Sequence, residues 1–378
     1  MNRFILILKT FLFALLASTH AVAGDKVSIQ DLAGRTVTLK TPVQTMILGE
    51  GRYLPTIGIL DRYNPIHRIV GLMGEFQKYD PATYQQYLKY FPGLTDIPSI
   101  GATGSASFNV ETSLTIRPDV AIFGLGSGHG PNDKSKTVLA QLEKAGIPVI
   151  ILDFRVNPLV NTPKSLSILG KIMGREKEAA EFLAFYHKEL EKVRSRITDV
   201  KNKPSVFMES RVGLMPQCCE VIGRAMMGRF IEWAGGQNAY GNKIPGTHGT
   251  VDREHLLVHQ PEIYIGTAIG NVLTENRFPK FLSLGVGTNE EAAKASLVKS
   301  LDRQELNQLR AIRQGKAHAI WHHFYNTPMN VVAVQRIAKW LHPDRFADLH
   351  PEETLKTYFK EFQPVPLEGV YWVSADKK

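Results

Sequence analysis

Six residues whose side chains suit an anionic or flat ligand follow closely after apolar, β-prone runs of the sequence. Arginine guanidinium groups bind carboxylate, catecholate or phosphate oxygens through two parallel hydrogen bonds, and aromatic rings cover the flat faces of a bulky ligand. Because His322 and His323 are adjacent, their side chains are expected to point in different directions. Taken singly, each arginine could equally be a surface charge or part of a structural ion pair, so the prediction depends on their convergence. The predicted ligand-binding residues are Arg52, Tyr53, Arg211, His322, His323 and Tyr325.

Two further histidines have the spacing of metal ligands but no third ligand near them in sequence. His255 and His259 are four residues apart on an expected helix, so they share one face. A catalytic zinc needs three protein ligands, and no nucleophile motif is present. We therefore predict no enzyme, with no catalytic residues, no directly bound metal and no cofactor. A secreted metal-dependent hydrolase using His255, His259 or His322 is the alternative from another functional class.

The elements that must position these residues alternate between β-prone runs and amphipathic helices. This alternation predicts βα units around mostly parallel sheets, whose ligands bind beyond the carboxyl ends of the strands. The expected strands of the first half are Val27–Gln30, Arg35–Lys40, Thr45–Leu48, Ile66–Leu72, Val120–Gly124 and Pro148–Leu152. Later strands are expected at Ser205–Met208, Glu262–Gly266 and Ala317–Trp321, and later helices at Arg253–His259, Arg303–Arg313, Met329–Leu341 and Pro351–Phe362.

A helical segment in the middle of the chain separates two runs of this βα pattern. One helix is expected to start at Thr162-Pro163 and end at Gly174, and a longer one of roughly six turns runs from about Arg175 to Ile197. The predicted fold is therefore α/β, with two Rossmann-like lobes joined by one long rigid helix and a ligand cleft between them. Its predicted parts are a signal peptide (1–23), an N-terminal lobe (24–160), a bridging segment (161–200) and a C-terminal lobe (201–378).

The first residues have the pattern of a cleavable signal peptide. Arg3 and Lys9 flank an apolar stretch that ends in the small residues Ala21-Val22-Ala23. We therefore expect export to the periplasm. The formal net charge is +9, and the signal segment holds two of these charges and no acid, which leaves +7. With no long basic run for nucleic acid, this balance favours an anionic ligand.

The chain has two cysteines, Cys218 and Cys219, and they are adjacent. An oxidising periplasm would allow a disulfide between neighbours, although ordinary disulfides join Cα atoms about 4.4–6.8 Å apart. Two small buried thiols are an equal alternative, and both stay open at this point.

Several motifs together resemble the class III periplasmic substrate-binding proteins of ABC importers, the iron–siderophore and cobalamin type. The motifs are Asp31-Leu-Ala-Gly-Arg-Thr-Val-Thr-Leu39, Phe108-Asn-Val-Glu-Thr112, Ile116-Arg-Pro-Asp-Val120, Ala234-Gly-Gly-Gln-Asn238, Val251-Asp-Arg-Glu254 and the stretch Leu309 to Phe346. The resemblance implies a monomeric receptor without catalysis that docks on an inner-membrane permease and its ATPase. It further implies one exposed docking glutamate per lobe, and Glu111 and Glu254 match those positions.

The resemblance and the positive charge together favour a ferric siderophore as the ligand, with an anionic carboxylate or catecholate complex fitting better than a neutral one. Haem, cobalamin, a small metal chelate and an oxyanion remain alternatives on the same fold. The sequence departs from better-known members at Cys218-Cys219 and in a longer insert, Phe278 to Ser300, and either could reshape the pocket.

Overall fold

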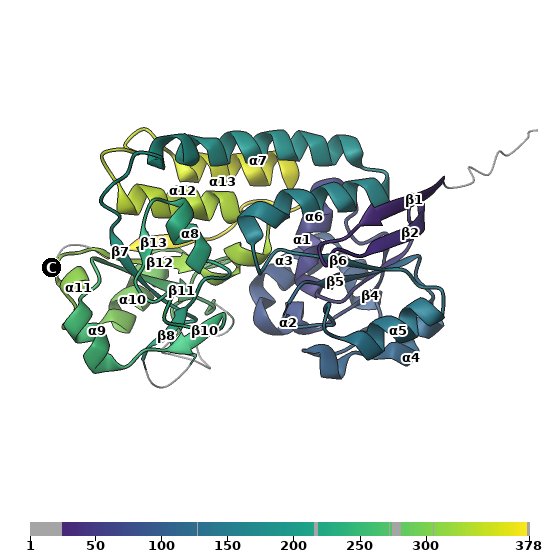
Figure 1. The fold of residues 1–378 in the computed structure, drawn as a ribbon, viewed down its shortest axis with the longest axis horizontal. Helices are drawn as coiled ribbons and strands as arrows, with labels where there is room; N and C mark the ends of the chain where they lie inside the picture. Colours follow the sequence, from purple (N-terminus) through teal and green to yellow (C-terminus); the bar gives the residue numbers. More distant parts are fainter. Residues whose placement is uncertain are drawn as a thin grey trace, which may run out of the picture.

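Two separate β-sheets, each covered by helices, divide the chain into an N-terminal and a C-terminal lobe (Figure 1). The computed structural model describes residues 25–126, 128–214, 218–271, 273, 281–304 and 306–375. The predicted signal peptide (1–23) lies outside the described residues. Within them, no helix combines the length and the apolar character needed to cross a membrane.

The N-terminal lobe is built on a parallel sheet in the order β4-β3-β5-β6. Its central strands are buried on both faces, as expected of parallel strands between helical layers. An antiparallel hairpin, β1–β2, is attached at the edge, where Leu32 N donates to Ile151 O at 2.9 Å. The elements are β1 (Asp25–Gln30), β2 (Thr36–Thr41), β3 (Met46–Leu48), α1 (Leu54–Leu60), β4 (Ile69–Leu72), α2 (Glu75–Tyr79), α3 (Pro81–Tyr90), α4 (Val110–Ile116), β5 (Val120–Gly124), α5 (Lys136–Lys144) and β6 (Val149–Leu152).

The C-terminal lobe has a mixed sheet in the order β10-β8-β7-β11-β12-β13, and β9 also pairs with β7. Its centre, β7-β11-β12, is parallel as predicted, but sequence reasoning missed three antiparallel strands: β8, and the edge strands β10 and β13. The elements are β7 (Ser205–Glu209), β8 (Glu220–Ile222), α8 (Gly228–Trp233), β9 (Gln237–Asn238), β10 (His248–Thr250), α9 (Arg253–His259), β11 (Ile263–Ala268), α10 (Glu290–Leu301), α11 (Arg310–Arg313), β12 (Ala317–Trp321), α12 (Asn330–Leu341), α13 (Pro351–Phe362) and β13 (Trp372–Ser374).

Two helix predictions differ from the structure. The helix α6 (Pro158–Met173) begins four residues before Thr162, because Pro158 already supplies the helical φ angle of a first position. The helix predicted over Arg303–Arg313 was too long, since α11 covers only its last four residues. Before it the chain makes tight turns, in which Leu306 N donates to Arg303 O and Leu309 N to Leu306 O.

A layer of helices spans both lobes and is wider than the single bridging helix that was predicted. The long helix α7 (Glu176–Ile197) runs along one side of the molecule, with α6, α12 and α13 beside it (Figure 1). Buried hydrogen bonds join the layers, because Asn330 of α12 accepts from Tyr186 OH of α7 at 2.8 Å and donates to Thr162 Oγ1 of α6 at 2.9 Å. The two lobes are therefore held by several packed helices.

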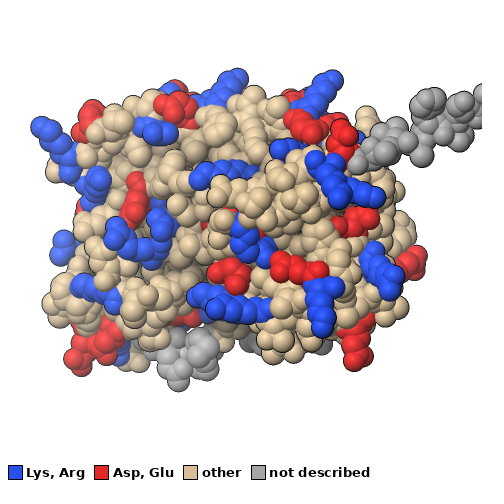
Figure 2. Space-filling view, turned by 45° about the vertical axis from the view of Figure 1, so that its right-hand side comes forward, with Lys and Arg blue, Asp and Glu red and all other residues tan. Residues whose placement is uncertain are grey.

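The surface charge is mixed in the view of Figure 2. On this face lysine and arginine side chains are spread over the surface, and acidic side chains lie between them. Despite the net positive charge of the chain, this face shows no patch of a single sign.

Candidate functional site

Arg52 lies at the centre of the contact between the lobes. It belongs to the short 3-10 turn after β3, and only 3 % of it is exposed. Its Nη1 atom donates to Tyr325 OH at 3.1 Å and lies 3.0 Å from His323 Nδ1, and both partners belong to the C-terminal lobe. Burial opposes the charge of Arg52, but nearby tyrosine and glutamate oxygens raise its pKa, so the guanidinium stays charged.

The His323 ring connects the lobes through both of its nitrogens. An arginine can only donate hydrogen bonds, so His323 Nδ1 must accept from Arg52. The proton therefore sits on Nε2, which lies 3.1 Å from the carbonyl oxygen of Tyr79 in the N-terminal lobe. Burial and the charge of Arg52 lower the pKa of His323 well below its usual range, which is consistent with this neutral form.

Arg155 and Glu50 complete the charged centre, and neither was predicted. Glu50 Oε1 accepts from Arg52 Nη2 at 2.7 Å and from Arg155 Nη2 at 3.0 Å. The Arg155 guanidinium also lies 4.9 Å from the centre of the Tyr325 ring, a cation–π distance. Burial would raise the pKa of the Glu50 carboxyl, but Arg155 and Arg52 outweigh it and lower that pKa to about 2.

A second carboxyl group, Glu75, lies on the inner side of Arg52. Its Oε1 atom accepts from the backbone N–H of Arg52 at 3.0 Å. Burial and the negative charge of Glu50 raise the pKa of Glu75 to about 8. Glu75 is therefore largely protonated at neutral pH, so the ionised Glu50 is the main counter-ion of the two arginines.

Arg211 and Glu220 form an ion pair in the C-terminal lobe. Arg211 follows β7, and its Nε donates to Glu220 Oε2 at 3.1 Å while its Nη2 bonds to Glu220 Oε1. Thr267 Oγ1 accepts from the Arg211 backbone N–H at 2.8 Å and lies 3.0 Å from His322 Nδ1. The side chain of Arg211 is 31 % exposed, so it is open to a ligand in a way that buried Arg52 is not.

Two histidines, one from each lobe, are kept neutral by burial and by these arginines. His129 belongs to the loop after β5, and His248 belongs to β10. Burial and Arg52 lower the pKa of His129 to about 3, and burial and Arg211 lower that of His248 to about 4. Arg155 and Arg211 also lower the pKa of both rings.

The predicted residues therefore fall into two groups. Arg52, His323 and Tyr325 meet through hydrogen bonds, and Arg211 lies close to His322 through Thr267. As expected, His322 and His323 point to different partners, but both are buried. Tyr53 is buried beside the charged centre: its ring packs on Phe154 with 5.2 Å between ring centres, and burial and the charge of Glu50 raise the pKa of its hydroxyl.

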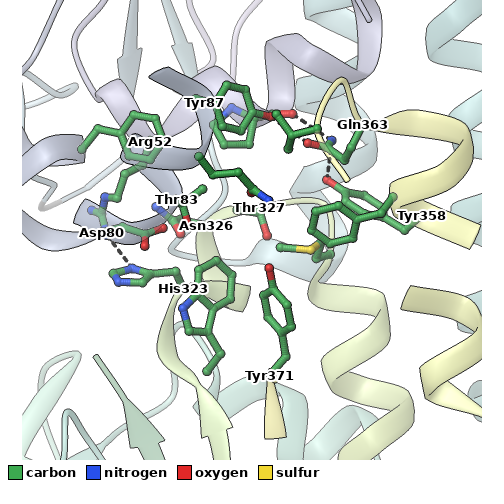
Figure 3. A pocket seen from close by; sticks show the side chains of 17 residues that line it. Arg52, Asp80, Thr83, Tyr87, His323, Asn326, Thr327, Tyr358, Gln363 and Tyr371 are labelled. Atoms are coloured by element: carbon green, nitrogen blue, oxygen red, sulfur yellow. Dashed lines mark hydrogen bonds between the residues drawn. The ribbon is translucent and has the colours of Figure 1, made fainter. Parts of the chain in front are cut away.

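A narrow cavity lies directly behind Arg52, between the lobes (Figure 3). Its volume of about 20 Å³ has room for about one water molecule. Arg52, Asp80 and Thr83 reach it from the N-terminal lobe, and Asn326 and Thr327 from the C-terminal lobe. Among the described residues, both amide atoms of Asn326 and the hydroxyls of Thr83 and Thr327 have no hydrogen-bond partner. Burial raises the pKa of Asp80 to about 6.

Sequence comparison assigns this arrangement to a family. The sequence profile of a family described as "Periplasmic binding protein" matches residues 74–317 of the chain. The chain belongs to the class III periplasmic binding proteins of ABC importers. No curated protein sequence matches the chain.

Solved structures of similar fold support the two-lobed architecture of this family. The TroA-like periplasmic binding protein FepB from Veillonella parvula superimposes with a TM-score of 0.80 at 24 % identity, covering 93 % of this chain and 100 % of that one. The molybdate-binding protein MolA from Haemophilus influenzae gives 0.67 at 17 % identity, over 91 % and 99 % of the two chains. The haem-binding protein RhuT from Roseiflexus gives 0.56 at 18 % identity, over 80 % and 99 %. At these identities the likeness shows the fold alone.

Of the three histidines named for the hydrolase alternative, His322 lies beside Thr267 in the site, while His255 and His259 lie on α9. The His255 and His259 rings stack on each other with centres 3.8 Å apart, and His255 Nε2 bonds to Lys243 Nζ at 2.9 Å. In the described part of the chain, the cluster that could hold a metal is Glu209 with the two cysteines, and it contains no histidine. The family and its structural neighbours are solute-binding proteins.

The two glutamates predicted to dock occupy matching places in the two lobes. Glu111 is the second residue of α4 and Glu254 the second residue of α9, and both are exposed. Each helix starts with a side-chain cap. Asn109 Oδ1 accepts from the backbone N–H of Thr112, and Asp252 Oδ1 accepts from the backbone N–H groups of Glu254 and His255. The helices α4 and α9 lie along the same side of the molecule, one under each lobe (Figure 1).

Proposed function

We propose that this periplasmic binding protein captures an anionic ferric siderophore between its lobes and delivers it to an ABC permease. The observation that supports the proposal is a cluster of three arginines that follow strand ends in the two lobes: Arg52 and Arg155 share Glu50, and Arg211 pairs with Glu220. With the nearby histidines neutral, the partly exposed positive charges of this cluster are the guanidinium groups of Arg155 and Arg211, with side chains 13 % and 31 % exposed. An anion is therefore favoured over a neutral or cationic ligand.

The exposed members of the cluster supply the expected ligand contacts. Arg155 and Arg211 have side chains that are 13 % and 31 % exposed, whereas Arg52 is committed to the inter-lobe contact. Guanidinium groups in a partly dry cleft bind carboxylate or catecholate oxygens strongly. Since several partners already fix these side chains, little ordering free energy is lost when the ligand binds.

Haem is a second candidate, which one observation favours. His129 and His248 are both neutral at physiological pH because burial and arginine charges lower the pKa of each ring. A neutral imidazole can ligate haem iron, and the arginines would face the propionates. The two candidates differ in whether the bound iron has a protein ligand.

The test is a titration of the purified protein by tryptophan fluorescence. Trp321 lies 5.2 Å from the His323 ring and serves as the reporter. The panel holds ferric catecholate, hydroxamate and citrate-type siderophores, haem, cobalamin and molybdate. We expect one ferric siderophore to bind saturably, and Arg155→Ala or Arg211→Ala to weaken it roughly 10- to 100-fold through lost charged hydrogen bonds.

Arg196→Ala is the matched control, because Arg196 pairs with Asp348 away from the cleft. It should leave the affinity unchanged. Haem or cobalamin binding in place of the siderophores would overturn the ligand assignment, and a siderophore affinity that is insensitive to both cleft arginines would overturn the proposed pocket.

A further inference from the structure

The adjacent cysteines form a disulfide at the edge of the proposed cleft. Cys218 and Cys219 are bonded to each other, Cys219 is 1 % exposed, and both pack on the apolar core of the C-terminal lobe. The next residue is Glu220, the first residue of β8. The disulfide therefore directly precedes the carboxylate that holds Arg211.

Backbone hydrogen bonds tie this segment to the strands on both sides. The carbonyl oxygen of Cys219 accepts from Val251 N at 3.1 Å, and that of Glu220 accepts from Ser210 N at 2.7 Å. Val221 pairs with Gly249 of β10 and with Glu209 of β7. The disulfide thus lies where β7, β8 and β10 meet, with Arg211 at the end of one of these strands.

The disulfide also lies on a buried ion pair that cannot easily move. The two sulfur atoms and a carboxylate oxygen of Glu209 lie within 4.8 Å of one another. Glu209 is held by Arg303 through two hydrogen bonds of 2.8 and 2.6 Å, and by Tyr264 OH. A neutral disulfide adds no charge next to this carboxylate, so it can pack there closely.

Arg211 needs such support, because its own backbone is unfavourable. Its φ angle of 49° lies in the left-handed region, which costs a residue with a side chain about 1–3 kcal/mol. The Glu220 carboxylate and Thr267 Oγ1 hold Arg211 in this conformation from opposite sides. Whatever fixes Glu220 therefore also fixes the guanidinium that we expect to contact the ligand.

We propose that the Cys218–Cys219 disulfide is a positioning element of the ligand site, which fixes Glu220 and through it the Arg211 guanidinium. The affinity for an anionic chelate then depends on the oxidation state of the pair. This inference rests on the proposed function for its effect on binding, but its effect on Arg211 is independent of any ligand. Opening the disulfide frees one long side chain, which must be ordered again when the ligand binds, and weakens binding about three- to tenfold.

The first measurement follows the Arg211 Nε–H group by NMR in the ligand-free protein. In the oxidised protein this proton is bonded to Glu220 Oε2 and should exchange slowly with water. Arg211→Lys identifies the signal by removing it. Treatment with a phosphine, which cleaves the disulfide to two thiols and becomes the phosphine oxide, should speed the exchange. An unchanged exchange rate would overturn the proposal whether or not a ligand is known.

The second measurement repeats the ligand titration on oxidised and phosphine-treated protein. The double variant Cys218→Ser, Cys219→Ser should bind like the reduced protein and should not respond to the phosphine. In Glu220→Gln the ion pair with Arg211 is already lost, so reducing the disulfide should have little further effect on ligand affinity. If oxidised protein binds no panel member, the proposed function fails, while the NMR result still decides the positioning role. Tight uptake of Zn²⁺ by the reduced pair with Glu209 would instead indicate a metal site and contradict a purely positioning role.

Discussion

At the scale of single residues, the charged side chains at the centre of the site are deeply buried. Glu50 accepts hydrogen bonds from Arg52 and Arg155, and 3 % of its side chain is exposed. Breaking a buried ion pair by removing one partner leaves a charge uncompensated, and this costs more than the pair itself contributes. Glu50 should therefore matter more for stability than the exposed acids.

Glu50→Gln keeps the shape of the side chain and removes its charge. We expect the free energy of unfolding to fall by about 3–5 kcal/mol, because two arginines would remain buried beside each other without their counter-ion. Urea denaturation followed by circular dichroism measures this loss. Glu220→Gln is the control, since Glu220 and its partner Arg211 are partly exposed, and it should cost about 1 kcal/mol or less. Equal losses in the two variants would contradict the central role of Glu50.

Several of these residues could be predicted from the sequence, and the reason others could not is physical. Ligands of α/β proteins bind beyond the carboxyl ends of parallel strands. This rule pointed to Arg52, Arg211 and the His322–Tyr325 segment, which all follow such strands. Arg155 obeys the same rule after β6 but was overlooked. His248 lies on an antiparallel edge strand of three residues. So short a strand cannot show the alternation of apolar and polar residues by which strands are recognised in a sequence. The ion pair between Glu50 and Arg155 joins residues 105 positions apart, and no local pattern indicates it.

At the scale of elements, the helical layer decides how the lobes are held. Tyr186 of α7 donates to Asn330 of α12, which in turn bonds to Thr162 of α6. The sequence predicted α7 and α12 well because both have long apolar faces. It could not predict this polar junction, since the partners of Asn330 lie 144 and 168 positions away in the chain.

Tyr186→Phe tests this junction between the helices. The change leaves the buried Oδ1 atom of Asn330 without its donor, so the free energy of unfolding should fall by about 1–3 kcal/mol in urea denaturation. Tyr240→Phe is the matched control, because the buried hydroxyl of Tyr240 has no partner within the described part of the chain. Its removal should be neutral or slightly stabilising. A loss in Tyr240→Phe as large as in Tyr186→Phe would show that the ring environment, and not the junction, determines the effect.

At the scale of the whole molecule, the two exposed glutamates lie far apart on one side. Glu111 and Glu254 start α4 and α9, and in the described structure neither carboxylate forms an ion pair. Like acids at any helix start, they also favour the local dipole. Two charges on two lobes would fix the orientation of the receptor on a permease.

Glu111→Ala and Glu254→Ala should each separate transport from binding. We expect ligand affinity to stay unchanged, while the apparent affinity for the permease falls at least roughly tenfold because a charged contact is lost. Ligand-stimulated ATP hydrolysis by the importer in liposomes measures the second quantity. Glu361→Ala is the control, as Glu361 is exposed on α13 in the helical layer. If both docking variants stimulate hydrolysis as well as this control does, the docking assignment is wrong.

The cavity behind Arg52 has a consequence for how the lobes come apart. Both amide atoms of Asn326 and the Thr327 hydroxyl have no protein hydrogen-bond partner in the described part of the chain, and the cavity beside them has room for about one water molecule. When the lobes separate, water can hydrate all of these groups. A contact made of apolar side chains alone would gain no such hydration on separation. Separating the lobes at this place should therefore cost less free energy than the buried area of the contact alone suggests.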